Sequence, residues 1–287
     1  MKYVLAVDGS DHSLDATRAF EALSPAEKLV VLNAVSMPGI PYPAMGAGVA
    51  KDLAVTVERA MKEEGNRIIE QAVSLLPLHA GKTEQRLETG SPAEVVLRIA
   101  REQEADLIVL GARGLGKIRE QVFGSVSHRV MTQAECATLI VKTPVRAIRN
   151  VLVPIESQED ADSILAFFKK KPFREPCSAT VLHVIPLSEP VWPMGALIPP
   201  DFRKEMVAYA EKFTNILCEE LKKLGHEAKG MALVGAPSTS IIEQAQQTSP
   251  DLIILRSHSR SGISRFFLGS VSHSVVHHTE CSIIVVR

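Results

Sequence analysis

The chain alternates short apolar runs with segments whose apolar residues recur at helical spacing. Residues 3–7 and 29–35 are short apolar runs that predict buried strands. Apolar residues between these two runs follow at helical spacing, and Ser10 or Asp11 is able to cap that helix. Strands that alternate with helices predict a mostly parallel sheet with helices on both faces.

The same alternation continues to the end of the chain. In the first half, further strands are predicted at 85–88, 106–110 and 138–141, and helices after residue 50, from Pro92 and at 125–131. In the second half, the predicted strands are 151–155, 180–185, 227–233, 252–255 and 283–286. The predicted helices of that half are 161–168, 203–224, 238–246 and 271–277. The expected fold class is therefore α/β and Rossmann-like, with a five-stranded, mostly parallel sheet in each half.

The two halves repeat one another at an offset of 145 residues. Residues 105–142 and 250–287 share Asp-Leu-Ile-x-Leu, Gly-Ser-Val-Ser-His and Glu-Cys in register. Two copies of one domain explain the length of 287 residues. The domains are expected at 1–143 and 149–287.

Composition excludes several classes of protein. Lys and Arg total 32 against 33 Asp and Glu, a balance that argues against a nucleic-acid-binding surface. No apolar run approaches the roughly 18 residues that a membrane helix needs, and the chain opens on a predicted strand rather than a signal segment. The 4 Cys lie far apart without a Cys-x-x-Cys pair, which favours free thiols in a reducing compartment. A cytoplasmic location is expected.

The loop after the fourth predicted strand has the strongest chemical signature. In open parallel sheets, ligands bind beyond the carboxyl ends of the strands. Gly111 and Gly114 follow such a strand, and Gly124 then opens a helix with Ser125 and Ser127 in its first turn. Free N–H groups and the helix dipole favour an anion there, although an ordinary helix cap has the same pattern. Nearby positive charge would come from Arg113, Lys117 and Arg119.

Asp8 ends the first predicted strand, so its carboxylate is expected in the same crevice. There it could accept a hydrogen bond from an adenine amine or a ribose hydroxyl. An Asx-turn or a helix cap within Asp8-Gly9-Ser10 is the alternative, and the two roles are compatible.

Taken together, these motifs resemble the tandem form of the universal stress protein family over essentially all of the chain. The resemblance is carried by VLAVDGS at 4–10, Gly90-Ser91-Pro92, the spacing Gly111-x2-Gly114-x9-Gly124-Ser125, and Glu135-Cys136. It implies an adenine nucleotide alpha hydrolase-like domain that binds ATP, ADP or AMP, with Mg²⁺ when a triphosphate is bound. The resemblance also implies dimerisation through the last strand. The nucleotide-binding residues it implies are Val7, Asp8, Ala34, Gly111, Ala112, Gly114, Gly124, Ser125, Val126 and Ser127.

The second copy departs from the pattern where binding would matter. Arg256 and Ser259 stand at the positions of Gly111 and Gly114, and Ile155 stands at that of Asp8. The Gly-Ser-Val-Ser segment at 269–272 survives, so an anion site could persist there. We therefore expect one competent and one degenerate nucleotide site.

The histidines near the end of the chain raise the question of a metal. His273 and His277 are four residues apart and able to share one ion, but no third ligand has a recognisable spacing. Surface or interface histidines are favoured, and no metal site is expected. His128 and His273 occupy equivalent positions and are expected to serve the structure of each repeat.

The function expected from the sequence is a stress-response adaptor whose nucleotide state is read by an unidentified protein partner. The halves are expected to pack as an intrachain pseudo-dimer through residues 138–142 and 282–286, with a homodimer of chains left open. A nucleotide-free interaction or chaperone-like scaffold is the rival, and an adenylate-forming or pyrophosphate-releasing enzyme is a more distant one. The sequence has no GxxxxGK[ST] loop and no evident nucleophile–base pair, so catalysis is limited to slow ATPase or self-phosphorylation at Ser125 or Ser127.

Overall fold

The computed structural model describes residues 1–36, 47–114, 123–186, 200–257 and 268–287. The strands are β1 (Lys2–Ala6), β2 (Lys28–Val35), β3 (Thr83–Thr89), β4 (Leu107–Gly111), β5 (Ala137–Val141), β6 (Asn150–Pro154), β7 (Ser178–Pro186), β8 (Glu227–Gly235), β9 (Leu252–Arg256) and β10 (Ser282–Val286). The helices are α1 (Asp11–Arg18), α2 (Ala47–Leu75), α3 (Pro92–Glu102), α4 (Ser125–Gln133), α5 (Gln158–Lys169), α6 (Pro200–Lys223), α7 (Pro237–Thr248) and α8 (Ser270–His278). Two short 3₁₀ helices are η1 (Ala19–Glu21) and η2 (Leu78–Ala80).

The described strands form one sheet in the order β3-β2-β1-β4-β5-β10-β9-β6-β7-β8. Each half contributes five parallel strands, as the sequence predicted, but the two sets are continuous rather than separate. They join where β5 and β10 pair antiparallel, with Leu139 opposite Ile284 and Ile140 opposite Ile283. The last strands of the two halves therefore meet, as expected. We call this place the β5–β10 junction.

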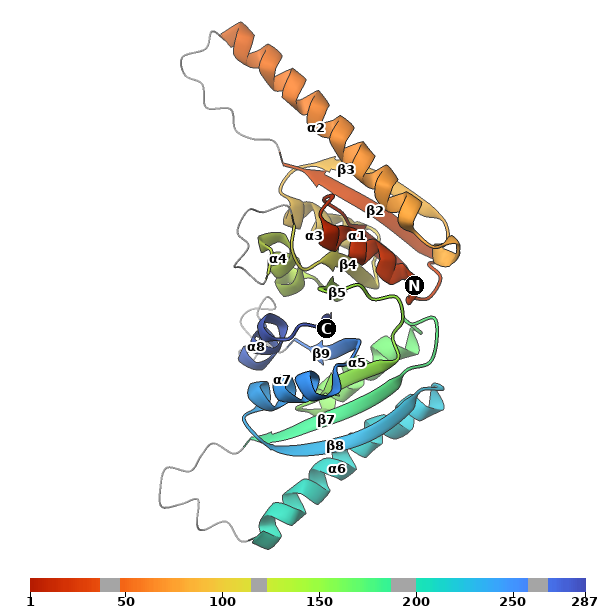
Figure 1. Cartoon of the computed structure of the whole chain (residues 1–287), viewed down its shortest axis with the longest axis vertical. Helices are drawn as coiled ribbons and strands as arrows, with labels where there is room; N and C mark the ends of the chain where they lie inside the picture. Colours follow the sequence, from red (N-terminus) through yellow and green to blue (C-terminus); the bar gives the residue numbers. More distant parts are fainter. Residues whose placement is uncertain (37–46, 115–122, 187–199, 258–267) are drawn as a thin grey trace.

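Helices cover both faces of the sheet. The elements α1, α2, α5 and α6 lie on one face, and α3, α4, α7 and α8 lie on the other (Figure 1). A hydrophobic core fills each face and runs across the junction, because Phe20 and Phe168 belong to one cluster and Val130 and Val275 to the other. The predicted α/β class, with a mostly parallel sheet and two repeated domains, is confirmed.

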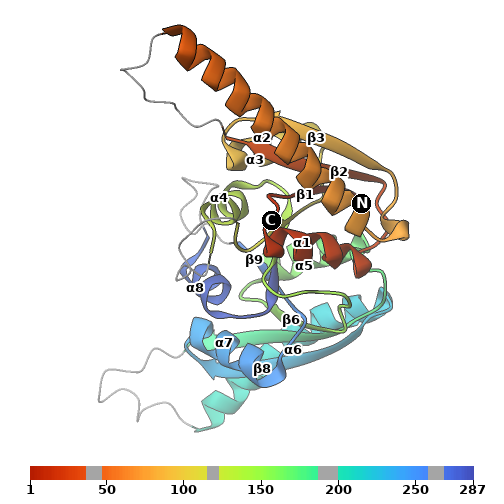
Figure 2. The same ribbon diagram turned by 45° about the horizontal axis from the view of Figure 1, so that its top comes forward.

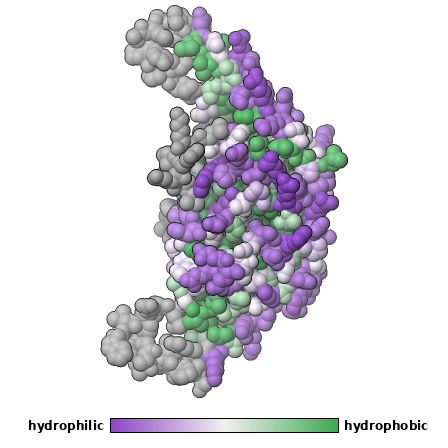
Figure 3. Space-filling model, viewed as in Figure 1, coloured by the Kyte–Doolittle hydropathy of each residue, from purple (hydrophilic) through white to green (hydrophobic). Residues whose placement is uncertain are grey.

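The molecule is elongated, with α2 and α6 at its two ends and α4 and α8 side by side near its middle (Figures 1 and 2). Hydrophilic residues cover most of the face in Figure 3, and hydrophobic ones gather near the outer ends of α2 and α6. No helix in the described part of the chain combines the length and the apolarity needed to cross a bilayer.

Polar side chains place the helices that follow β1 and β6. Ser10 caps α1 by accepting a hydrogen bond from the Ser13 N–H at 3.3 Å. In α5, the hydroxyl of Ser157 accepts from the Asp160 N–H, and the Asp160 carboxylate accepts from the Ser157 N–H. Both halves thus begin their first helix directly beyond the carboxyl end of a central strand, where ligands of parallel sheets bind.

Reciprocal contacts hold the two halves together at the junction. The Lys142 ammonium donates to the carbonyls of Val276 and Thr279 at 2.6 and 2.5 Å, at the C-terminal end of α8. Arg287, which is the equivalent of Lys142 in the second repeat, donates to the Met131 carbonyl near the end of α4. Each repeat thereby supplies a cation to the negative end of a helix in the other repeat, a favourable arrangement for both helix dipoles.

Candidate functional site

A cleft of about 760 Å³ opens at the carboxyl ends of the strands in the first repeat. Its volume lies in the range of pockets that hold small molecules, roughly 300–1,000 Å³. Its lining residues come from the ends of β1, β2 and β4, from the start of α1 and from α3 and α4. They include Val7, Asp8, Ala34, Gly111, Gly114, Gly124, Ser125, Val126 and Ser127.

The cleft thus contains nine of the ten residues predicted from the sequence. The tenth, Ala112, is buried beneath it and does not line it. The Ala112 N–H donates to Val141 at 2.8 Å, and its carbonyl accepts from the Gly124 N–H at 2.8 Å. Ala112 therefore fixes the beginning of α4 against the end of β4.

Asp8 combines the two roles that the sequence left open. Its Oδ1 atom accepts from the Ser10 N–H at 3.0 Å and from the Ser10 hydroxyl at 2.6 Å, which is an Asx-turn. Its Oδ2 atom lies against Gly114, so closely that a Cβ added to Gly114 would collide with it. The turn fixes the carboxylate at the cleft wall, with one oxygen on the side of the glycine loop.

The two glycines after β4 are needed for different contacts. A Cβ on Gly111 would lie 2.6 Å from the backbone carbon and oxygen of His12, so Gly111 lets α1 approach the end of β4. Gly114 is exposed, and a Cβ added to it would meet only the Asp8 side chain. A substitution at Gly111 would therefore disturb the fold, whereas one at Gly114 would act on the cleft.

The start of α4 supplies donors for an anion. Gly124 is the N-cap and offers no side-chain cap, and the first helical bond runs from the His128 N–H to the Gly124 carbonyl at 2.9 Å. Helix geometry leaves the N–H groups of Ser125, Val126 and Ser127 without intrahelical acceptors. These groups and the dipole of α4 favour negative charge in the cleft.

The two serines of that turn differ. The buried Ser127 hydroxyl donates to the Gly111 carbonyl at 2.6 Å, and Ser272 makes the same bond to Arg256 at 3.0 Å in the second repeat. A hydroxyl used identically in both repeats is a structural feature of the fold. Ser125, by contrast, is exposed and lines the cleft.

His12 and Phe123 are among the lining residues of the cleft that sequence reasoning missed. The His12 Nδ1 atom is shielded from solvent and has no hydrogen-bond partner among the described residues. A polar residue in the first turn of α1 was the available signal, because that turn begins at the sheet edge where ligands bind. The signal for Phe123 was its position directly before Gly124. Lys117, Arg119 and Ser259, which the sequence analysis also named, lie outside the described residues.

The corresponding place in the second repeat is occupied by the protein's own side chains. The Arg256 guanidinium lies 2.5 Å from a Glu159 oxygen and 3.6 Å from the buried carboxylate of Asp160. The second repeat therefore has a cation at the position of Gly111, where the first repeat has a glycine packed against α1.

The sequence alignment put Ile155 at the position of Asp8, but the sheet makes it the counterpart of Val7, because the Ile155 N–H donates to Leu182 as the Val7 N–H donates to Leu32, both at 2.9 Å. The exposed Glu156 therefore stands where Asp8 does in the first repeat.

Comparison with known proteins is consistent with this architecture. The family model described as the universal stress protein family matches residues 1–142 and again residues 147–287. The chain belongs to the universal stress protein family.

Two curated members of the family match different lengths of this chain. This universal stress protein is 30% identical to universal stress protein YxiE of Bacillus subtilis over 151 residues, which cover 49% of this chain and 98% of that protein. It is 24% identical to universal stress protein Mb2028c of Mycobacterium bovis over 302 residues, which cover 99% of this chain and 96% of that one. One relative thus corresponds to a single repeat and the other to the tandem.

A solved structure shares the fold over the whole length. A universal stress protein from Archaeoglobus fulgidus superposes with a TM-score of 0.67 at 18% identity, covering 100% of this chain and 96% of the other. At that identity the similarity concerns the fold alone.

A second cluster of polar side chains lies at the β5–β10 junction of this universal stress protein. His128 of α4 and His273 and His277 of α8 place nitrogen atoms within 4.8 Å of one another. Burial, together with the neighbouring imidazoles and Lys142, lowers the pKa of His277 to about 4. The sequence analysis found no third residue for His273 and His277 because that residue comes from the other repeat.

Proposed function

We propose that the first repeat of this universal stress protein binds ATP or another adenine nucleotide, and that the bound state is read by a protein partner. The observation that carries the proposal is the cleft in which Asp8 and the exposed backbone of Gly114 face the free N–H groups of α4. Phosphate oxygens would accept from these N–H groups, and Asp8 would accept from a ribose hydroxyl or an amine.

The same reasoning assigns one site to each chain. In the second repeat, the Arg256 guanidinium stands at the position of Gly111 and pairs with Glu159, and the counterpart of Asp8 is Glu156. We propose that the second repeat serves as a fixed partner domain for the first. Mg²⁺ would enter only with a triphosphate, because Asp8 and Asp11 are the carboxylates among the described lining residues, and Mg²⁺ sites of this kind are completed by phosphate oxygens.

Calorimetric titration of the nucleotide-stripped full-length protein with ATP, ADP and AMP, with and without Mg²⁺, tests the proposal. We expect one nucleotide per chain. Gly114→Arg places a long side chain against Asp8 and should weaken binding at least tenfold while the far-ultraviolet circular dichroism spectrum is unchanged. Ser259→Arg puts the same side chain at the equivalent sequence position of the second repeat and is the matched control.

Three results would contradict the proposal. Two nucleotides per chain would show that Arg256 does not close the second site. Normal binding by Gly114→Arg would show that the phosphates lie elsewhere. The absence of binding in folded wild-type protein would favour the nucleotide-free scaffold, in which the glycine loop is only structural.

A further inference from the structure

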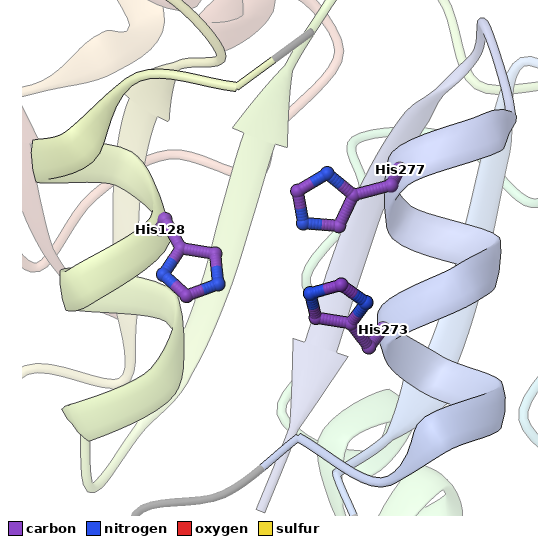
Figure 4. Close-up of side chains that lie close together, drawn as sticks. All are labelled: His128, His273 and His277. Atoms are coloured by element: carbon purple, nitrogen blue, oxygen red, sulfur yellow. The ribbon is translucent and has the colours of Figure 1, made fainter. Parts of the chain in front are cut away.

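The three histidines at the β5–β10 junction come from both repeats. His273 and His277 lie four residues apart, which places them on the same side of α8, and their ring centroids are 4.2 Å apart. His128 projects from α4 on the opposite side of the junction, with its ring centroid 6.0 Å from that of His273 and 5.8 Å from that of His277. The three rings point toward one another (Figure 4).

The internal repeat explains why they gather. His128 and His273 are equivalent residues at the offset of 145, and antiparallel pairing of β5 with β10 brings equivalent residues of α4 and α8 together. The position equivalent to His277 is Thr132, whose hydroxyl donates to the His128 carbonyl at 2.7 Å. Three imidazoles rather than four therefore meet at the junction.

One of the imidazole nitrogens has no partner in the described part of the protein. His277 Nε2 is shielded from solvent and forms no hydrogen bond with any described residue. A buried polar atom without a partner destabilises the folded protein, because it has lost its hydrogen bonds to water. A ligand that accepts the lone pair of this nitrogen would remove the cost.

We propose that His128, His273 and His277 form a binding site for a divalent transition-metal ion such as Zn²⁺, which links the two repeats at the β5–β10 junction. Imidazole nitrogen suits zinc, copper and nickel, whereas magnesium and calcium require oxygen ligands. Zinc with bonds of about 2.0–2.1 Å holds tetrahedral nitrogens roughly 3.4 Å apart, so small side-chain rotations bring atoms that already lie within 4.8 Å into range. A fourth position remains for water or another ligand.

The surroundings of the site agree with this assignment. Lys142 is a neighbouring cation, and its ammonium is held by the Val276 and Thr279 carbonyls at the end of α8. This hydrogen bonding directs its ammonium protons to the backbone.

Competition between the chelator-treated full-length protein and a chromophoric zinc chelator tests the site. We expect one Zn²⁺ per chain, and an affinity at least tenfold weaker in each of His128→Gln, His273→Gln and His277→Gln. His278→Gln is the matched control, because His278 is exposed on the same helix and its Nδ1 contacts the Ser274 carbonyl at 2.8 Å. Its affinity should stay within twofold of wild type.

A second measurement guards against variants that fail to fold. Zn²⁺ should raise the midpoint of thermal unfolding of the wild type and of His278→Gln, and leave that of His128→Gln unchanged. Because the His273 side chain is exposed, His273→Gln is the variant expected to disturb folding least. The proposal would be overturned if wild type and His128→Gln bound Zn²⁺ with the same affinity. It would also be overturned if His278→Gln lost as much Zn²⁺ affinity as the three ligand variants. Neither experiment requires nucleotide, so the two proposals fail independently.

Discussion

Arg256 and Glu159 form an ion pair at 2.5 Å at the end of β9, where the first repeat has Gly111 packed on His12. The pair joins the last residue of β9 to the first turn of α5. Two repeats with one fold thus use the same sheet edge differently. In one, a glycine lets α1 approach the end of the strand, and in the other a guanidinium pairs with the first turn of α5.

Arg256→Met should lower the stability of the protein without creating a second nucleotide site. The buried Asp160 would lose its neighbouring cation, which we expect to cost about 1–3 kcal/mol in the free energy of unfolding. Urea unfolding and calorimetric stoichiometry are the measurements. Glu159→Gln is the control and should cost less than about 1 kcal/mol, since that carboxylate is 72% exposed. Two bound nucleotides per chain in Arg256→Met would contradict this account.

Ser127→Ala and Ser272→Ala should destabilise the protein by similar amounts, about 1–2 kcal/mol each, because each removes the same hydrogen bond to a strand-end carbonyl. Nucleotide affinity should change less than twofold in Ser127→Ala, since the backbone N–H remains. Ser125→Ala, which removes an exposed hydroxyl from the cleft, should weaken affinity more. A larger loss of affinity in Ser127→Ala than in Ser125→Ala would show that the Ser127 hydroxyl turns to the ligand.

Lys142→Met should weaken the β5–β10 junction. The Val276 and Thr279 carbonyls at the end of α8 would lose a charged donor, at an expected cost of about 1–2 kcal/mol in unfolding free energy. Chemical unfolding followed by circular dichroism measures the loss. Lys169→Met, at an exposed position near the end of α5, should change stability by less than about 0.5 kcal/mol. Equal losses in the two variants would argue against the cross-repeat cap.

The Asp106–Lys170 ion pair, at 2.5 Å between the two repeats, should contribute stability that depends on pH. Burial by itself raises the pKa of Asp106, but hydrogen bonds from the Lys170 ammonium and the Lys2 N–H outweigh it, and the pKa is lowered. A carboxyl whose pKa is lower in the folded state contributes stability above its unfolded pKa, near 3.9, and this stability is lost as the pH falls through the folded pKa.

We therefore expect Asp106→Asn to be less stable than the wild type at neutral pH, and the difference to shrink below about pH 4. Urea unfolding over a pH series measures the difference. Asp251→Asn is the matched control, since Asp251 is the equivalent residue and accepts backbone N–H groups of Arg149 and Asn150 at 2.8 Å. A double-mutant cycle with Lys170→Met should give a coupling of about 0.5–1 kcal/mol for the half-exposed pair. A coupling of zero would show that the ion pair with Lys170 is not the source of the stability contributed by Asp106.

The sequence by itself determined the repeat, the order of strands and helices, and the edge of the sheet at which a ligand would bind. These features follow from local patterns: apolar periodicity, the turn at Asp8, and glycines directly after a strand. Nine of the ten residues that the family resemblance implied line the cleft. The motif VLAVDGS contains Val7 and Asp8, and the signature Gly111-x2-Gly114-x9-Gly124-Ser125 orders those that follow β4. The tenth predicted residue, Ala112, is buried and does not line the cleft, which only the packing of the chain decides.

The tertiary structure alone decided what meets at the β5–β10 junction. His128 and His277 are far apart in the chain, and so are Lys142 and Thr279, and no local pattern links residues at such separations. Their proximity depends on antiparallel pairing of two strands from different repeats in one register. The offset of 145 shows which residues are equivalent, but only the pairing of the strands shows that equivalent residues face one another.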